Sequence, residues 1–207
     1  MASVAMAPVS HPVTLAERPD FSVIGEIIQP ASRVLDLGCG EGELLAWLLE
    51  HKQVLARGVE ISALQVRKAI SRGVSAYQGD IDEGLADYPD KAFDYVILSQ
   101  TLQETRSPLH VLQEMLRVGR RAIVSFPNFG HWSVRKAMLF TGQAPKTKLF
   151  PYDWYNSPNI HFLSINDFED LCRHSAFPIE KRYFLSGSSR VSTMPNLLAQ
   201  TAVFLLG

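Results

Sequence analysis

The chain has 207 residues, of which 46% are hydrophobic and 20% are charged, and its formal net charge at pH 7 is -1. This composition excludes a disordered or fibrous protein and predicts one globular domain. Because acidic and basic residues are interspersed along the whole chain, no basic face for nucleic acid is expected. No apolar run approaches the ~20 residues that a membrane helix needs, and no signal peptide is recognisable.

Two cysteines, Cys39 and Cys172, lie far apart and match no metal-ligand spacing. We therefore expect no disulfide framework and no metal site. A reducing compartment suits such a chain, so we expect a cytoplasmic protein that binds neither nucleic acid nor a membrane.

Residues 1–19 are rich in Ala, Pro, Ser and Val without a usable period, and they predict a flexible leader ahead of a domain over 20–207. That domain is expected to open with a helix that Asp20 caps and that Pro30 ends. Apolar runs then alternate with helical patterns. The predicted strands are 33–37, 56–59, 75–78, 93–98 and 121–126, and the predicted helices are 43–51, 63–71 and 108–117.

From about 127 to 165 this alternation gives way to aromatic residues, Pro, Asn and His, which predicts an insertion. Its aromatic side chains are open to three interpretations: internal packing, a lid over a substrate, or a surface for a partner protein. A helix that Asn166 or Asp167 opens follows, and then strands at 180–185 and 201–206. The predicted fold class is α/β, a doubly wound, mostly parallel seven-stranded sheet with helices on both faces, because parallel strands need crossover connections that cover the sheet.

The most informative segment, residues 34–43, reads VLDLGCGEGE, a strand that runs into three glycines and then a helix. Glycines allow a sharp turn and a close approach to a ligand at the crevice of such a sheet. A dinucleotide fingerprint would need a glycine where Glu43 stands, and the nearby Asp36 and Glu41 are unfavourable for a phosphate. A nicotinamide oxidoreductase is therefore disfavoured, and a ligand with a cationic amino-acid end suits these acids better.

Two further acids follow the next two strands. Glu60 lies 20 residues after Gly40, where a carboxylate can accept both hydroxyl hydrogens of a ribose, and Ile61 can pack against an adenine. Asp80 can accept a hydrogen bond from an exocyclic amine, and the Ile81 backbone amide can donate one to a ring nitrogen. A single acid after a strand is often only a helix cap. Three acids at three successive strand ends predict a nucleoside-type site.

This pattern resembles the class I S-adenosylmethionine (SAM) dependent methyltransferases, which are Rossmann-like, over about residues 31–126. The resemblance implies SAM or S-adenosylhomocysteine (SAH) as ligand, with Glu60 at the ribose and Asp80 at the adenine amine. It also implies a set of residues around the methionine part: Asp36, Gly38, Cys39, Gly40, Gly42, Ser99 and Gln100.

A second resemblance, to the MetW family of methionine biosynthesis proteins, runs over nearly the whole chain from residue 20. It rests on residues 33–45, 98–103, 115–132, 154–155 and 158–161. It implies association with MetX, a homoserine O-acetyltransferase or homoserine O-succinyltransferase, whose acylation of homoserine the family assists. Two hypotheses follow: a SAM-binding accessory subunit that activates this homoserine O-acyltransferase, or an active SAM-dependent methyltransferase on a small-molecule acceptor.

The residues do not single out a catalytic base. Methyl transfer from a sulfonium depends largely on positioning, so a general base is optional. The two main candidates are His131, which follows the fifth strand, and His161 in the aromatic insertion, and Glu104 and Tyr155 are weaker ones. A histidine among aromatic residues is more often a hydrogen-bonded structural residue.

Overall fold

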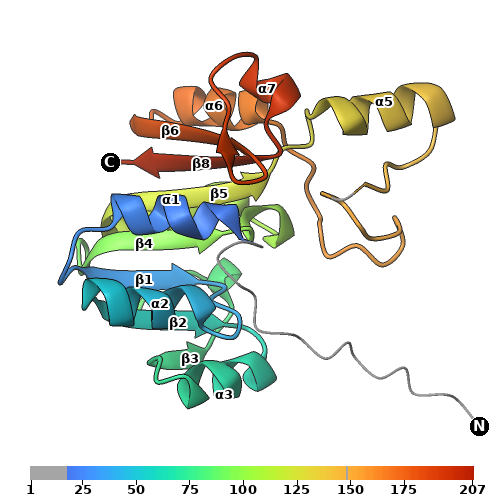
Figure 1. The fold of residues 1–207 in the computed structure, drawn as a ribbon. Coiled ribbons are helices and arrows are strands. Elements are labelled where there is room, and N and C mark those ends of the chain that lie inside the picture. The colour runs from blue at the N-terminus through green and yellow to red at the C-terminus, as the bar shows by residue number, and fades with distance from the viewer. Residues whose placement is uncertain (1–17, 148) are drawn as a thin grey trace, which may run out of the picture.

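The computed structural model describes residues 18–147 and 149–207, and its backbone forms a twisted sheet between two layers of helices (Figure 1). The helices are α1 (Pro19–Ile27), α2 (Glu43–Lys52), α3 (Ala63–Ser71), α4 (Pro108–Val118), α5 (Trp132–Thr141), α6 (Ile165–His174) and α7 (Pro195–Leu198), with two 3-10 turns, η1 (Ile81–Glu83) and η2 (Leu102–Glu104). The strands are β1 (Arg33–Leu37), β2 (Leu55–Glu60), β3 (Ala76–Gln78), β4 (Phe93–Ser99), β5 (Gly119–Pro127), β6 (Ile179–Ser186), β7 (Ser189–Arg190) and β8 (Thr201–Leu206). Most of the predicted leader, residues 1–17, lies outside the described residues.

The strand order is β3-β2-β1-β4-β5-β8-β6-β7, and the first five strands are parallel, as the alternation predicts. The remaining three strands pair antiparallel. The described residues thus hold eight strands, one more than the seven expected. The extra strand, β7, has two residues that pair with the end of β6, which is too short to leave a periodic pattern in the sequence.

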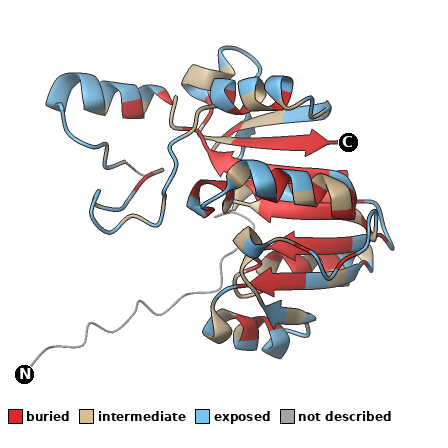
Figure 2. Cartoon of the chain, turned by 180° about the vertical axis from the view of Figure 1, so that it is seen from behind, coloured by how far each residue is buried: buried red, intermediate tan, exposed pale blue. Residues whose placement is uncertain are grey.

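Each face of the sheet buries its own apolar core, because successive side chains of a strand point to opposite faces. In β1, Val34 packs with the core under α1 and α2, while its neighbour Leu35 packs with the core under α4 and α6. The central strands β1, β4, β5 and β8 are accordingly buried along most of their length (Figure 2). None of the helices within 18–147 and 149–207 is long and apolar enough to cross a membrane.

The start of α1 differs from the prediction that Asp20 caps it. The N-cap residue is Arg18, Pro19 occupies the first turn, and no side-chain cap forms. Asp20 lies inside the helix and is 2% exposed. Its carboxylate accepts hydrogen bonds from Arg18, Ser99 and Ser125. Ser99 and Ser125 lie 79 and 105 residues away along the chain, which is why the local pattern pointed to a cap instead.

The predicted insertion contains a helix, α5, that projects from the body of the protein (Figure 1). We call residues 128–147 and 149–164 the arm. Only Val134 of α5 is buried, so the helix has no apolar stripe facing a core, and that periodic signal was absent from the sequence. The sequence predicted that Asn166 or Asp167 would open α6. In the structure the N-cap is Ser164, and Asp167 completes a capping box with it from inside the helix.

Candidate functional site

A cleft of about 380 Å³ opens beside the carboxyl ends of β1, β2 and β4, and a second cavity of about 220 Å³ adjoins it. The two share Gly38, Gly40 and Gln65. The predicted residues that line the first are Gly38, Gly40, Glu60, Ile61, Asp80 and Ile81. Those that line the second are Asp36, Gly38, Cys39, Gly40 and Ser99. The structure thus brings nine of the eleven predicted binding residues together, and Gly42 and Gln100 line neither cavity.

The glycine turn after β1 takes a left-handed backbone that strongly favours glycine. Gly38 has φ +71°, and a Cβ there would lie 2.8 Å from the Thr101 side chain. Gly42 has φ +75°, and its Cβ would lie 2.9 Å from the Cβ of Ala69 in α3. Gly38 therefore shapes the cleft, whereas Gly42 permits close packing of α3 behind it.

Glu60, at the end of β2, is fixed by the backbone on both sides of its carboxylate. Oε2 accepts a hydrogen bond from the Gly40 amide at 3.0 Å and Oε1 accepts one from the Ser62 amide at 2.9 Å. The residue is 7% exposed and lines the cleft. Each carboxylate oxygen has a second lone pair, so Glu60 can still accept from hydroxyl groups of a ligand.

Asp36, near the end of β1, is 3% exposed, and its Oδ1 has no hydrogen-bond partner. Burial raises the pKa of Asp36 to about 8, and the nearby charges of Glu60 and Asp20 act in the same direction, while Arg18 opposes them. A buried acceptor without a partner costs free energy unless a ligand donates to it. A cationic group in the adjoining cavity would satisfy this carboxylate.

Asp80 follows β3 and has partners of its own. Its Oδ1 caps η1 by accepting from the Asp82 amide at 2.9 Å. Its Oδ2 accepts a hydrogen bond from Arg106 at 2.5 Å, and Arg106 also bonds Asp82. Sequence reasoning missed Arg106, for which the only signal was one basic residue in the loop after β4. A ligand amine at Asp80 would share the carboxylate with this exposed guanidinium.

Ser99 and Gln100, at the end of β4, are held by a polar cluster that sequence reasoning also missed. Ser99 Oγ donates to Asp20 Oδ2 at 2.7 Å and accepts from Arg18 at 2.7 Å. Burial opposes ionisation of Asp20, but the hydrogen bonds from Arg18 and the two serines hold the pKa of Asp20 below its ordinary value. Gln100 has φ 57°, and its backbone amide donates a hydrogen bond to Ser125 Oγ. The cluster ties α1 to the end of β4 at the wall of the second cavity.

The two candidate histidines lie outside both cavities. His131 is 4% exposed, and its Nδ1 accepts from the Ser133 amide and so caps α5. Burial lowers the pKa of His131. His161 is exposed in the arm, and its backbone amide donates to the Gln103 carbonyl at 3.0 Å. Of the four residues considered as a base, Glu104, which the sequence ranked below the histidines, is the one that lines the cleft.

Cys39 lines the second cavity, but burial raises the pKa of its thiol to about 12, so the reactive thiolate is absent near neutral pH. Across residues 18–147 and 149–207, no group of three or more His, Cys, Asp and Glu side chains is placed to hold a metal ion.

Comparison with known proteins gives a family match over almost the whole chain. The family model described as "Methionine biosynthesis protein MetW" matches residues 18–206. The bifunctional methionine biosynthesis protein MetXA/MetW of Rhodopirellula baltica is 38% identical over 200 residues, which cover 89% of this chain and 32% of that protein. This chain thus spans about a third of the length of that relative.

A second relative and a solved structure point to the methyltransferase fold. The 27-O-demethylrifamycin SV methyltransferase of Amycolatopsis mediterranei is 33% identical over 112 residues, 48% of this chain and 40% of that enzyme. A SAM-dependent methyltransferase from Archaeoglobus fulgidus superposes with a TM-score of 0.66 at 15% identity, over 93% of this chain and 92% of its own. At that identity the likeness establishes the fold, a class I methyltransferase-like α/β sheet, and not the activity.

Proposed function

The chain belongs to the MetW family of methionine biosynthesis proteins, and from that premise we propose that it is a SAM-binding accessory subunit of the homoserine O-acyltransferase MetX. The observation that carries the proposal is the Rhodopirellula baltica relative, whose name joins MetXA and MetW in one protein. Two activities joined in one chain commonly serve the same step, and separate proteins that correspond to them are expected to associate.

The two adjoining cavities fit SAM or SAH in their chemistry. Glu60 offers fixed acceptors for ribose hydroxyls, and Asp80 offers an acceptor for an amine. Asp36 offers an unpartnered buried oxygen to an ammonium group. Gly38 and Gly40 line both cavities, so one extended ligand can cross the glycine turn. When bound, SAM supplies an electrophilic methyl group on a sulfonium.

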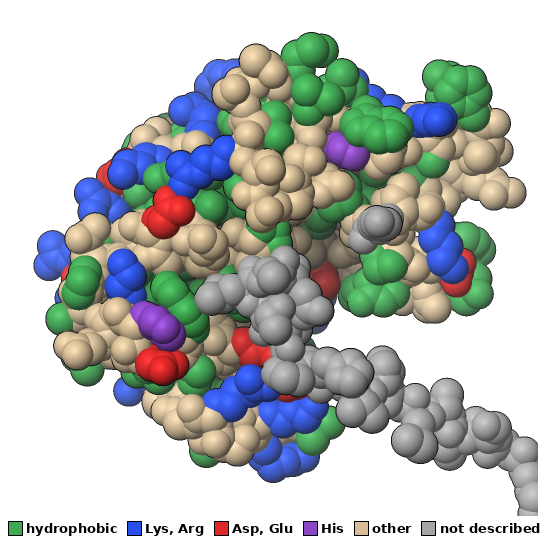
Figure 3. Space-filling view, in the orientation of Figure 1, with side chains coloured by type: hydrophobic (Ala, Val, Ile, Leu, Met, Phe, Trp, Pro, Cys, Tyr) green, Lys and Arg blue, Asp and Glu red, His purple; other side chains and the backbone are tan. Residues whose placement is uncertain are grey.

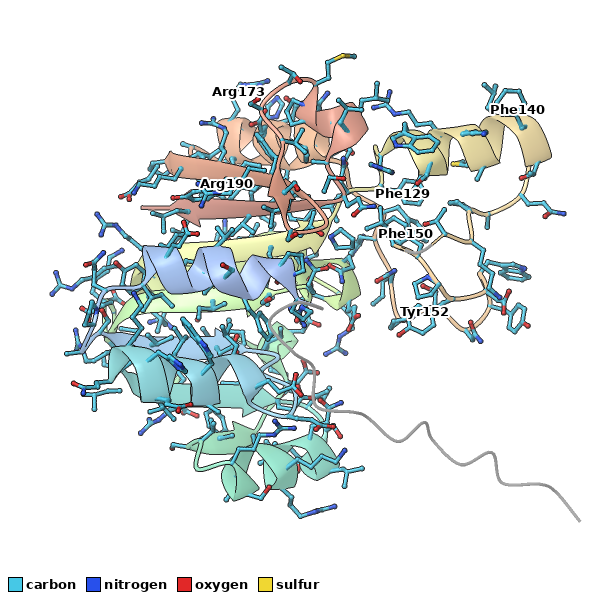
Figure 4. The ribbon with its side chains drawn as sticks, viewed as in Figure 1. Phe129, Phe140, Phe150, Tyr152, Arg173 and Arg190 are labelled. Carbon is cyan, nitrogen blue, oxygen red and sulfur yellow. The ribbon has the colours of Figure 1, made fainter. Side chains whose placement is uncertain are left out.

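The arm supports the accessory role because it leaves large apolar side chains uncovered. Hydrophobic side chains gather on this projecting part (Figure 3), and Phe140 and Tyr152 lie on different segments of it, away from the sheet (Figure 4). The large hydrophobic residues of the arm that are more than 45% exposed are Trp132, Met138, Leu139, Phe140, Tyr152, Trp154, Tyr155, Ile160 and Phe162. Aromatic residues and Met are enriched at protein interfaces, and an apolar surface of this kind marks an interaction site.

The base of the arm is held in place by aromatic packing and by hydrogen bonds to the body of the protein. Phe129 contacts Phe150 at 5.3 Å and Phe162 at 4.7 Å between ring centroids, and Figure 4 shows Phe129 and Phe150 together where the arm meets the body. Asn128 bonds the carbonyls of Asn196 and Ala199. The arm is therefore anchored at its base and offers its outer aromatic residues to a partner.

A SAM-dependent methyltransferase with a small-molecule acceptor is the second candidate. It is favoured by the cleft itself and by the match to the 27-O-demethylrifamycin SV methyltransferase. Neither candidate histidine lines either cavity, but a general base is optional for methyl transfer, so their positions do not decide between the two candidates. An intact cleft supports binding without requiring turnover.

The deciding experiment measures the initial rate of the cognate homoserine O-acyltransferase alone, with this protein, and with this protein and SAM. Stimulation by the protein supports the accessory role, and a further change with SAM makes the ligand a signal. No stimulation and no co-elution of the two proteins would contradict the role and favour a search for methyl acceptors. Calorimetric titration with SAM and with NAD tests the ligand class, and binding of NAD alone would overturn the assignment of the cleft.

A further inference from the structure

The turn η2 carries one acidic side chain into the wall of the cleft. Thr101 begins this turn and lies directly against Gly38, the glycine that both cavities share. Glu104, at the end of the same turn, lines the cleft. In the part of the chain that the structure describes, its carboxylate has no hydrogen-bond or ion-pair partner.

The wall around Glu104 is acidic. The acids that line the cleft are Glu60, Asp80, Asp82 and Glu104, and no lysine or arginine lines it among the described residues. Arg106, at its rim, pairs with Asp80 and Asp82 and leaves the other two without a cation. Glu104 is an exposed residue, and desolvation of its carboxyl group together with the charge of Glu60 raises its pKa, as expected for two carboxylates that line one cavity.

A second, independent feature indicates positive charge in the ligand. Asp36 is 3% exposed, lines the adjoining cavity, and has an oxygen without a partner. A ligand that reaches from Glu60 to Asp36 must cross the glycine turn beside Thr101. The centre of such a ligand therefore passes the turn that holds Glu104.

We propose that Glu104 makes the cleft select the positively charged sulfonium of SAM over the neutral thioether of SAH. This inference rests on the proposed SAM site. SAM and SAH differ by one methyl group and one positive charge, and a positive charge near an unpaired carboxylate gains a Coulomb energy that the neutral thioether does not. A protein with this selectivity responds to the supply of SAM and is little affected by SAH that accumulates.

Calorimetric titration of the full chain with SAM, with SAH and with the amine analogue sinefungin tests the proposal. Sinefungin carries a positive charge near the position of the sulfonium. We expect SAM and sinefungin to bind about five- to tenfold more tightly than SAH, the range that one partly screened charge pair supplies. In Glu104→Gln, which keeps the shape of the side chain, we expect the ratio to fall to about one through weaker binding of the cations.

Glu50→Gln is the matched control, because Glu50 is an exposed acid on α2, its side chain 79% exposed, and lines neither cavity. The ratio in this variant should equal that of the unmodified protein. The salt dependence of binding gives a test without mutation. Because salt screens charge interactions, raising the ionic strength should reduce the ratio of SAM to SAH affinity in the unmodified protein.

The outcomes separate this inference from the proposed function. Equal affinity for SAM and SAH, or a ratio that Glu104→Gln leaves unchanged, would overturn the selectivity and leave the SAM site standing. Failure of all three ligands to bind would overturn the SAM site and the selectivity with it.

Discussion

The cleft and the arm differ in which kind of side chain they present to a partner. In the cleft, the buried carboxylate of Glu60 is paired with two backbone amides. In the arm, apolar side chains are left in water, and Trp154 is 79% exposed. The difference indicates two kinds of partner: a small polar ligand for the cleft and a protein surface for the arm.

The two regions meet at one point of the backbone. The amides of Ile160 and His161 in the arm both donate to the carbonyl of Gln103, at 2.8 and 3.0 Å. Gln103 belongs to η2, the turn that also carries Glu104. A change in the wall of the cleft therefore has a direct connection to the arm.

The largest expected effect comes from Asp36, the buried carboxyl group that lines the second cavity. The unfolded chain ionises Asp36 near pH 4, whereas the folded protein keeps it protonated to about pH 8, so this residue makes the free energy of unfolding fall as pH rises between those values. From pH 5 to pH 8 its contribution amounts to about 4 kcal/mol. Asp36→Asn removes this contribution.

Urea unfolding of both proteins at pH 5, 6.5 and 8 measures the effect. The stability of Asp36→Asn relative to the unmodified protein should grow with pH. Curves that stay parallel over this range would show that Asp36 titrates near its ordinary pKa.

The next effect concerns ligand affinity in the cleft. Glu60→Gln replaces a charged acceptor by a neutral one and removes one of two oxygens, so we expect SAM to bind about a hundredfold more weakly by calorimetry. Asp94→Asn is the control, because Asp94 lies at the opposite end of the sheet in β4 and bonds Arg33. An affinity as weak in the control as in Glu60→Gln would refute the assigned ribose contact.

A smaller effect tests the arm. Trp154 and Tyr155 are 79% and 71% exposed, so replacing both by Ala should leave the thermal midpoint unchanged. If they lie at the centre of the interface, affinity for the homoserine O-acyltransferase falls about tenfold or more. Leu55→Ala, at a 68% exposed residue of β2, should bind the partner normally. A lower thermal midpoint in the double variant would mean that these side chains stabilise the arm itself.

The smallest expected effect tests whether a ligand in the cleft changes the dynamics of the arm. If the connection through Gln103 is rigid, SAM in the cleft slows amide exchange at Ile160 and His161 about threefold, by suppressing local opening. Amides of β8, on the far side of β5, serve as the reference. Unchanged exchange at both arm amides, with SAM bound, would show that the arm does not sense the ligand.

The sequence by itself determined the sheet and much of the cleft. Strand and helix patterns depend on residues close in sequence, and they placed Asp36, Glu60 and Asp80 at the ends of three parallel strands. Because the carboxyl ends of parallel strands meet at one edge, the acids converge without further information. The local pattern did not separate the role of Gly42, which packs against α3, from that of Gly38.

Only the tertiary structure decided what depends on distant partners. Asp20 joins Ser99 and Ser125, which lie 79 and 105 residues away, and no local pattern encodes such contacts. The packing of Thr101 against Gly38 places the turn that carries Glu104 beside the cleft. Separately, α5 forms a helix although only one of its residues is buried. The reason is physical: periodicity reports which face of an element is buried, whereas a polar cluster or an uncovered arm is defined by contacts that the folded chain brings together.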